Sequence, residues 1–190
     1  MKKKIFQTII LVLLVTCLLT ALALCYSVDK YELELKKVII ISLVISCTLI
    51  FFVNRVLKYM SEVMYLNSPL SKIDKMVGEE FEYYLKLKLQ KLGYKVEITP
   101  KTGDYGADLF CFRGDETIVV QAKRYEGNVG TAAVQEVTAA REYYEAGSAV
   151  VITNSYFTLN ALNLAEANKV ALIDRDDLLN FRDNQLYYTE

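Results

Sequence analysis

The sequence predicts an α/β domain with a mixed β-sheet flanked by helices, preceded by two membrane-spanning helices. Two long uncharged apolar runs occupy residues 5–26 and 38–53. A hairpin pattern follows at residues 109–123, where two runs rich in β-branched and aromatic residues flank a Gly-Asp turn. After it, helical and strand-like periods alternate to the end of the chain, which is typical of a sheet with helices on both sides.

The composition excludes several kinds of catalytic site. The 190 residues contain no histidine and no tryptophan, which removes Ser-His-Asp and Cys-His catalysis and histidine-bound zinc. The four cysteines form no CxxC pair, so neither a disulfide framework nor a zinc knuckle is indicated. From residue 68 onward, 14 Lys and Arg stand against 19 Asp and Glu, a net charge of −5 that argues against simple electrostatic binding of nucleic acid.

The N-terminal region, residues 1–57, is expected to form a transmembrane hairpin. Its first apolar run, residues 5–26, follows three lysines and reaches the roughly 20 residues that a bilayer span requires. The second, residues 38–53, is slightly short, but the basic side chains that flank it can snorkel to the interface. Two alternatives stay open: a buried helical core, and a secretory signal cleaved near residues 21–23.

The positive charges also predict an orientation. The lysines at residues 2–4 favour an internal N-terminus, and two spans then return the chain to the inside. If the first span were removed, the remaining one would start outside and the C-terminal domain would again end inside. We therefore expect a multi-pass protein of the inner (cytoplasmic) membrane with its C-terminal domain in the cytoplasm.

Residues 58–70 are expected to link the membrane hairpin to the domain. Apolar residues continue at helical spacing through residues 54–70, which fits a continuation of the second span, a helix on the membrane surface or a plain helical linker. The domain itself is expected at residues 71–190. It opens with a helix at residues 71–92 that starts with a capping-box-like Ser71 and ends at Gly93.

The remaining elements of the domain follow from short local patterns. In chain order we expect a strand at 94–99, the hairpin, a helix at 131–145, a buried strand at 148–153, a helix from Thr158 to about Asn168, a strand at 170–173 and a short helix from Asp174.

Three polar side chains are expected to meet at one end of the hairpin. Asp108 starts the first strand, and Gln121 and Lys123 lie near the end of the second, where strand alternation points both to the same face. Taken singly, Asp108 could be a strand-start residue, and the other two the solvated face of an edge strand. Taken together in the most apolar strand of the hairpin, they need partners or a purpose. An acid, an amide and an amine suit a hydrated cation beside a phosphodiester.

Four further residues are candidates with equal or stronger alternatives. Glu82 lies beside the inward Phe81 on the first helix, from which it could reach the hairpin, although a surface glutamate is the commoner case. Asn154, Ser155 and Thr158 precede a helix N-terminus, whose free N–H groups can hold a substrate phosphate. Ordinary loop polarity explains these three residues equally well.

A series of short motifs runs in order through residues 78–178. They are Gly78-x-x-Phe81-Glu82, Leu92-Gly93-Tyr94-x-Val96, Thr102-Gly103-Asp104-x-Gly106-Ala107-Asp108, Val120-Gln121-Ala122-Lys123-Arg124-Tyr125, Val129-Gly130, Val134-Gln135-Glu136, Thr153-Asn154-Ser155-x-Phe157-Thr158 and Leu172-Ile173-Asp174. With these motifs the chain resembles the Mrr-like (type IV) restriction endonuclease domain of the PD-(D/E)xK nuclease superfamily.

The resemblance implies an αβββαβ core and a divalent-metal site that takes Mg²⁺. It makes Asp108 the metal-binding acid, Gln121 the second position, Lys123 the catalytic amine and Glu82 an additional acid and metal ligand from the first helix. The wider superfamily usually carries Asp or Glu at the second position. Gln121 supplies a neutral carbonyl oxygen instead, a variant known in the Mrr-like group, so the site has one negative charge fewer.

Together these observations predict a membrane-anchored, Mg²⁺-dependent DNA endonuclease that hydrolyses phosphodiester bonds in defence against foreign DNA. The alternative is a catalytically silent, membrane-tethered module that binds nucleic acid or acts as a scaffold, which the acidic domain and the neutral Gln121 favour. A nuclease for RNA or for branched or damaged DNA is a third hypothesis. Cutting both strands of a duplex needs two active sites, which favours a homodimer.

Overall fold

The structure is a computed structural model that describes residues 14–22, 32–100 and 105–189. The chain divides into two compact units, Met1–Val63 and Met64–Glu190. The division falls close to the end of the long apolar helix.

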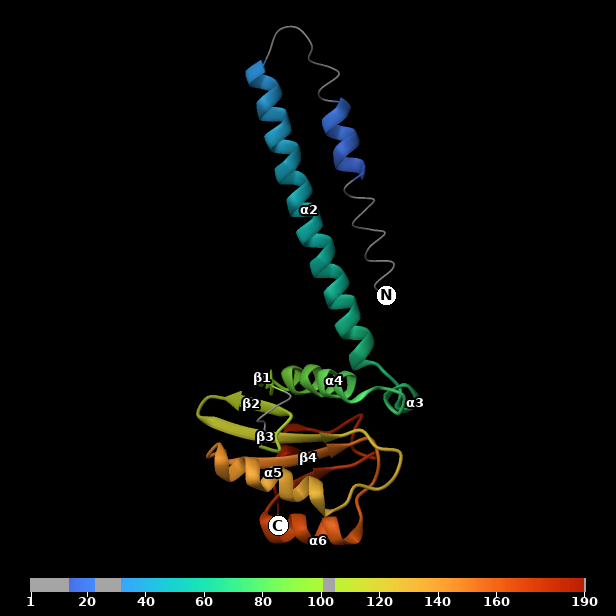
Figure 1. Cartoon of the computed structure of the whole chain (residues 1–190), viewed down its shortest axis with the longest axis vertical. Helices are drawn as coiled ribbons and strands as arrows, with labels where there is room; N and C mark the ends of the chain where they lie inside the picture. Colours follow the sequence, from blue (N-terminus) through green and yellow to red (C-terminus); the bar gives the residue numbers. More distant parts are fainter. Residues whose placement is uncertain (1–13, 23–31, 101–104, 190) are drawn as a thin grey trace. The chain divides into compact units, whose positions relative to one another are not determined.

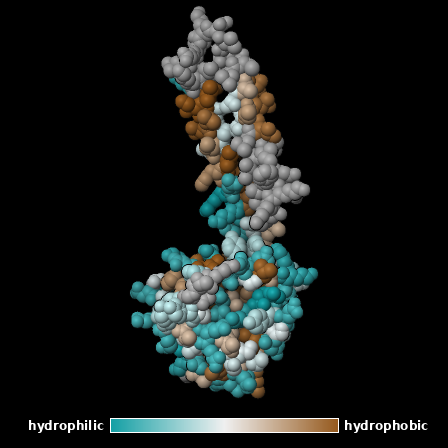
Figure 2. Space-filling model, viewed as in Figure 1, coloured by the Kyte–Doolittle hydropathy of each residue, from teal (hydrophilic) through white to brown (hydrophobic). Residues whose placement is uncertain are grey.

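The apolar region contains helix α2, Glu32–Leu66, whose 35 residues form one continuous helix (Figure 1). Within its segment Lys37–Leu66, a stretch of 18 residues has a mean hydropathy of 2.3, and among the described residues this is the helix long and apolar enough to cross a membrane. None of this apolar stretch is buried, and hydrophobic side chains, brown in Figure 2, form patches along it. The predicted second span therefore lies within a longer helix that also takes in most of the predicted linker.

The predicted first span is described only in part. Residues 14–22 are helical, whereas the rest of the run at 5–26 lies outside the described residues. The transmembrane hairpin thus stays a prediction, and within residues 14–22, 32–100 and 105–189 one helix is long and apolar enough to span a membrane.

The folded unit is a mixed five-stranded sheet with the strand order β1-β2-β3-β4-β5. Strands β1 (Lys95–Ile98), β2 (Leu109–Arg113) and β3 (Glu116–Lys123) pair antiparallel, and β4 (Ser148–Thr153) and β5 (Ala171–Ile173) continue the sheet in parallel. The predicted order is confirmed: antiparallel strands that include the hairpin come first, and helices and strands alternate after them. β3 is a central strand, which rules out the solvated-edge explanation for its polar residues.

Helices cover both faces of the sheet (Figure 1). Helix α4 (Gly78–Lys91) packs on one face together with the C-terminal segment and its 3-10 helix η1 (Asp183–Leu186). Helices α5 (Thr131–Tyr143) and α6 (Leu159–Asn168) pack on the other. Each face therefore has its own apolar core, and the side chains of β3 alternate between them: Ile118 and Val120 toward α4, and Val119 toward α5.

The single helix expected at residues 71–92 is wrong. Two helices occupy this stretch, a short α3 (Leu70–Ile73) and α4, separated by an extended Val77. The chain breaks because Asp74, which follows α3, is held by Arg175 and Asn154 from the distant end of the sheet. Glu80 accepts a hydrogen bond from the Val77 amide (3.3 Å) at the start of α4, and Gly93 adopts a φ of +96° just beyond its end, as predicted.

The short helix expected from Asp174 is also wrong. Residues 175–180 form turns, and the 3-10 helix η1 follows only at Asp183. The Leu178 amide donates to the Asp174 carbonyl (2.9 Å), but this single helix-like turn is not continued into a regular helix, and the Arg175 amide and guanidinium bond to Ser155 and Asp74 instead.

Candidate functional site

Asp108 and Gln121 meet directly, as the hairpin predicted. The Asp108 Oδ2 atom accepts hydrogen bonds from the Gln121 side-chain Nε2 (2.6 Å) and from the Ala122 amide (2.7 Å). Gln121 is only 5% exposed. Because its amide nitrogen is directed at a carboxylate, its oxygen Oε1 points elsewhere, and this buried atom has no hydrogen-bond partner among the described residues.

Asp108 is held in place by backbone bonds on both sides. Its amide donates to the Val120 carbonyl of β3 (2.9 Å), and its carbonyl accepts from the Thr99 amide (3.0 Å) at the end of β1. The Thr99 hydroxyl adds a bond to the Ala107 carbonyl (2.6 Å). The carboxylate therefore starts from a backbone that two neighbouring strands fix.

Glu82 shares a cavity with Asp108. This cavity has a volume of about 380 Å³ and lies between the first turns of α4 and the end of β1; its lining is Val77, Gly78, Glu79, Glu82, Thr99, Pro100 and Asp108. Glu79, from the first turn of α4, also lines it. The cavity brings a helix carboxylate and the strand carboxylate to one opening, as the resemblance implied for Glu82.

Lys123 contacts a residue that the sequence analysis did not single out. Its Nζ atom lies 2.7 Å from Oε2 of Glu136 on α5, and its side chain is 17% exposed against 43% for Glu136. The shared direction of Gln121 and Lys123 is thus toward the α5 face. Glu136 is part of the motif Val134-Gln135-Glu136, but no local sequence pattern links it to Lys123, which lies 13 residues earlier and is separated from it by a loop.

Gly106 joins the loop before Asp108 to the same helix. Its φ is +93°, and a Cβ atom placed on it would lie 2.4 Å from the Glu136 carbonyl oxygen. Only a residue without a side chain allows this approach of backbone to backbone. The loop that carries Asp108 and the turn of α5 that carries Glu136 are consequently packed against each other.

The three residues considered for a phosphate have internal partners. The Asn154 side chain, 3% exposed, donates to Asp74 (2.9 Å) and accepts from the Tyr125 amide (2.8 Å). Thr158 caps α6 by accepting from the Ala161 amide (3.2 Å), and Ser155 is 8% exposed. Their contacts give them structural roles, and the phosphate role stays a prediction.

Asp74 and Arg175 form a bidentate ion pair next to this loop. Arg175 Nη1 lies 2.7 Å from Oδ1 of Asp74, and Nη2 lies 2.9 Å from Oδ2. The hydrogen bond from Arg175, reinforced by the one from Asn154, holds the pKa of the Asp74 carboxyl below its usual value. The pair fixes the segment between α3 and α4 to the carboxyl ends of β4 and β5.

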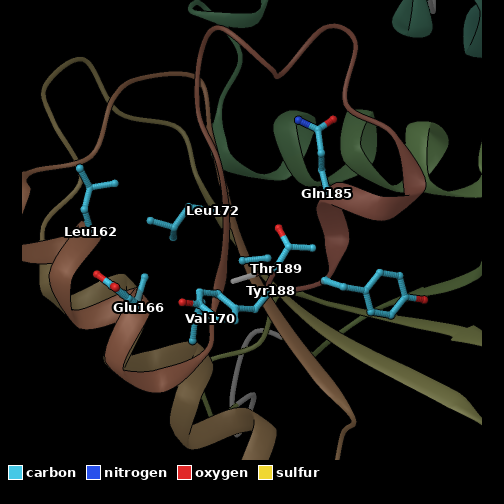
Figure 3. A pocket seen from close by; sticks show the side chains of 10 residues that line it. Leu162, Glu166, Val170, Leu172, Gln185, Tyr188 and Thr189 are labelled. Carbon is cyan, nitrogen blue, oxygen red and sulfur yellow. The ribbon is translucent and has the colours of Figure 1, made fainter.

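A second cavity, of about 260 Å³, lies at the β5 edge of the sheet and contains none of the predicted site residues. Leu162 and Glu166 of α6 line one side of it, and Gln185, Tyr188 and Thr189 of the C-terminal segment line another (Figure 3). It offers no cluster of acids or amines comparable to the Asp108 region.

The donor set around Asp108 fits a hard divalent cation. Magnesium takes oxygen ligands and keeps several waters, so carboxylate oxygens and one amide oxygen suffice. The buried Oε1 of Gln121 is an oxygen without a protein donor, which is the property a ligand atom needs. Among the residues the structure describes, no three His, Cys, Asp or Glu side chains are grouped for a metal, so an all-carboxylate site is not formed.

Comparison with known proteins points to one family. A family model of the Mrr catalytic domain, described as "Restriction endonuclease", matches residues 73–181. No curated protein matches the chain. A solved structure described as "Protein of Unknown Function AF1548" is 14% identical with a TM-score of 0.45, and the match covers 52% of this chain and 62% of that one.

Proposed function

We propose that this chain, which belongs to the restriction endonuclease family of the Mrr catalytic domain, is a membrane-anchored, Mg²⁺-dependent endonuclease that hydrolyses DNA phosphodiester bonds. The matched residues span more than half of the chain and contain Asp108, Gln121 and Lys123. Membership of this family supports a nuclease activity on DNA.

The proposal rests on the hydrogen bond that the Gln121 side-chain amide donates to the Asp108 carboxylate. Gln121 is buried in a central strand, where its side-chain nitrogen donates to a carboxylate and its oxygen has no partner among the described residues. A buried oxygen without a hydrogen bond lowers the stability of the folded domain. Such a cost is understandable where the oxygen serves a ligand. We propose that Asp108, Gln121 and Glu82 hold the cation, which when bound supplies Lewis acidity and a water of lowered pKa.

The protein's own groups would perform the remaining tasks. Asp108 keeps the Gln121 amide in one orientation, so its oxygen presents a fixed ligand atom. Lys123, at the end of β3, would orient or deprotonate the attacking water and donate hydrogen bonds to the phosphate oxygens where negative charge develops. The cavity that Asp108 and Glu82 line would give the phosphodiester an approach to these two carboxylates.

The apolar helix α2 supports the membrane anchor. Its segment Lys37–Leu66 exposes hydrophobic side chains along its length, which water does not favour and a bilayer does. We propose that the chain resides in the inner membrane with the nuclease domain in the cytoplasm, where it would meet incoming foreign DNA. Alkaline extraction should leave the protein in the membrane pellet, and protease should reach the domain only in inverted vesicles. Release from the pellet, or cleavage from outside, would contradict this placement.

Cleavage of supercoiled plasmid by the full chain in detergent tests the catalytic assignment. With Mg²⁺ the wild-type chain should nick or linearise the plasmid, and chelation should stop it. Asp108→Asn and Lys123→Met should each lower the rate about 100-fold or more. Asp115→Asn, in the exposed hairpin turn, is the matched control and should cut at the wild-type rate. Equal rates in all four proteins would refute the site. DNA binding without cleavage by the wild type would instead support the silent module.

A further inference from the structure

The Lys123 amine is paired across two elements of the fold. Its Nζ atom lies 2.7 Å from Glu136 Oε2, and this oxygen is buried with no hydrogen-bond partner among the described residues beyond the ion pair. The lysine lies at the end of β3 and the glutamate in the second turn of α5. The carboxylate oxygen therefore depends on the ammonium, and Glu136 gives the ammonium a charged neighbour on a packed helix.

Glu136 is itself held firmly. Its neighbours Val134 and Val137 are fully buried against the sheet, so the turn of α5 that carries it cannot shift freely. On the other side, the Gly106 backbone approaches its carbonyl closely enough to exclude any Cβ atom. This one turn of α5 thus contacts both the lysine and the loop that ends at Asp108.

We propose that Glu136 is a positioning residue that holds the Lys123 ammonium at the edge of the nuclease site. A lysine side chain has a flexible four-carbon stem, so a charge partner decides where its ammonium group lies. Glu136 would keep that group beside the strand end that Gln121 also occupies, ready for a phosphate oxygen. The inference rests on the proposed function and adds a residue to it.

Steady-state cleavage of plasmid DNA by the full chain tests the proposal. Glu136→Gln keeps the length and one acceptor oxygen but removes the charge, and it should lower kcat about tenfold while KM for DNA changes less than about twofold. In a Lys123→Met background, the same substitution should have no further effect, because the group it positions is gone. Glu142→Gln is the matched control, since Glu142 lies on the same helix but is exposed and pairs with the adjacent Arg141.

Two results would overturn the proposal. One is an unchanged kcat in Glu136→Gln; the other is an equal loss with and without Lys123, which would indicate a general structural effect. A crystal structure of Glu136→Gln gives a readout independent of activity: the Lys123 ammonium should leave its wild-type position, and an unmoved ammonium would contradict a positioning role. If the wild-type chain cuts no DNA, the proposed function fails, whereas the crystal structure still decides whether Glu136 places the amine.

Discussion

Replacing Gly106 with alanine should damage the nuclease domain more than any comparable substitution of a surface glycine. The added Cβ would lie 2.4 Å, 2.7 Å and 2.9 Å from the carbonyl oxygen, carbonyl carbon and Cα of Glu136, all backbone atoms that cannot rotate away. Overpacking of this kind costs about 1–3 kcal/mol, and a positive φ adds roughly 1–2 kcal/mol for a residue with a side chain. We expect a total loss of about 2–5 kcal/mol.

Gly93→Ala separates these two costs. Gly93 has a similar φ of +96°, but no atom lies within 4 Å of its added Cβ, so only the backbone strain applies. Thermal unfolding of the full chain in detergent, followed by circular dichroism, should show a Tm for Gly106→Ala that is several degrees below that of Gly93→Ala, at about 2–4 °C per kcal/mol for a chain of this size. Equal shifts would refute the contact between the Asp108 loop and α5.

Three further predictions concern stability. The hydrogen bonds from Tyr94 and Arg113 lower the pKa of Asp183 in the folded chain below its ordinary value of 3.8. In chemical unfolding, the free energy of unfolding of the wild type should therefore exceed that of Asp183→Asn by a full margin above pH 3.8, and this margin should shrink as the pH falls through the folded pKa. Burial lowers the pKa of Lys88 from 10.5 to about 8, so between these pH values the unfolded chain binds more protons than the folded chain. The free energy of unfolding of the wild type should therefore increase between pH 8 and 10.5, and it should increase less in Lys88→Met. Thr158→Ala removes the α6 cap and should cost about 1 kcal/mol by urea unfolding, whereas Thr158→Ser should cost little; equal losses would contradict the capping role.

Local patterns were sufficient to predict much of the fold. The apolar run at residues 148–153 became β4 with the expected bounds, because a strand buried on both faces has no polar alternation to obscure it. The Gly-Asp turn after Arg113 closed the predicted hairpin, and Thr158 capped α6. Each of these features depends on residues close together in the chain.

The features that sequence reasoning missed depend on distant partners. The break between α3 and α4 follows from the ion pair of Asp74 with Arg175, 101 residues away, and helical periodicity carries no trace of it. The partner of Lys123 was missed for a related reason. Local patterns predicted a helix at residues 131–145, but they could not show that Glu136 on it reaches back over the end of β3.

Within the site, the prediction was better for some residues than for others. The contact of Asp108 with Gln121 follows from strand pairing. Leu109 lies opposite Val120 in the antiparallel register, so Asp108, one residue before Leu109, lies opposite Gln121, one residue after Val120. Spacing could not show that the Gln121 side-chain oxygen would be left without a partner, because this depends on the orientation of the amide beside the Asp108 carboxylate.

Anomalous diffraction from Mn²⁺ in crystals of the full chain tests the central claim most directly, because it locates a cation without reference to activity. We expect one anomalous-difference peak within ligand distance, about 2.1–2.5 Å, of both an Asp108 carboxylate oxygen and Oε1 of Gln121. The peak should be lost in Asp108→Asn. A peak elsewhere in the domain, or none in a wild-type chain that nevertheless cuts DNA, would contradict the central claim.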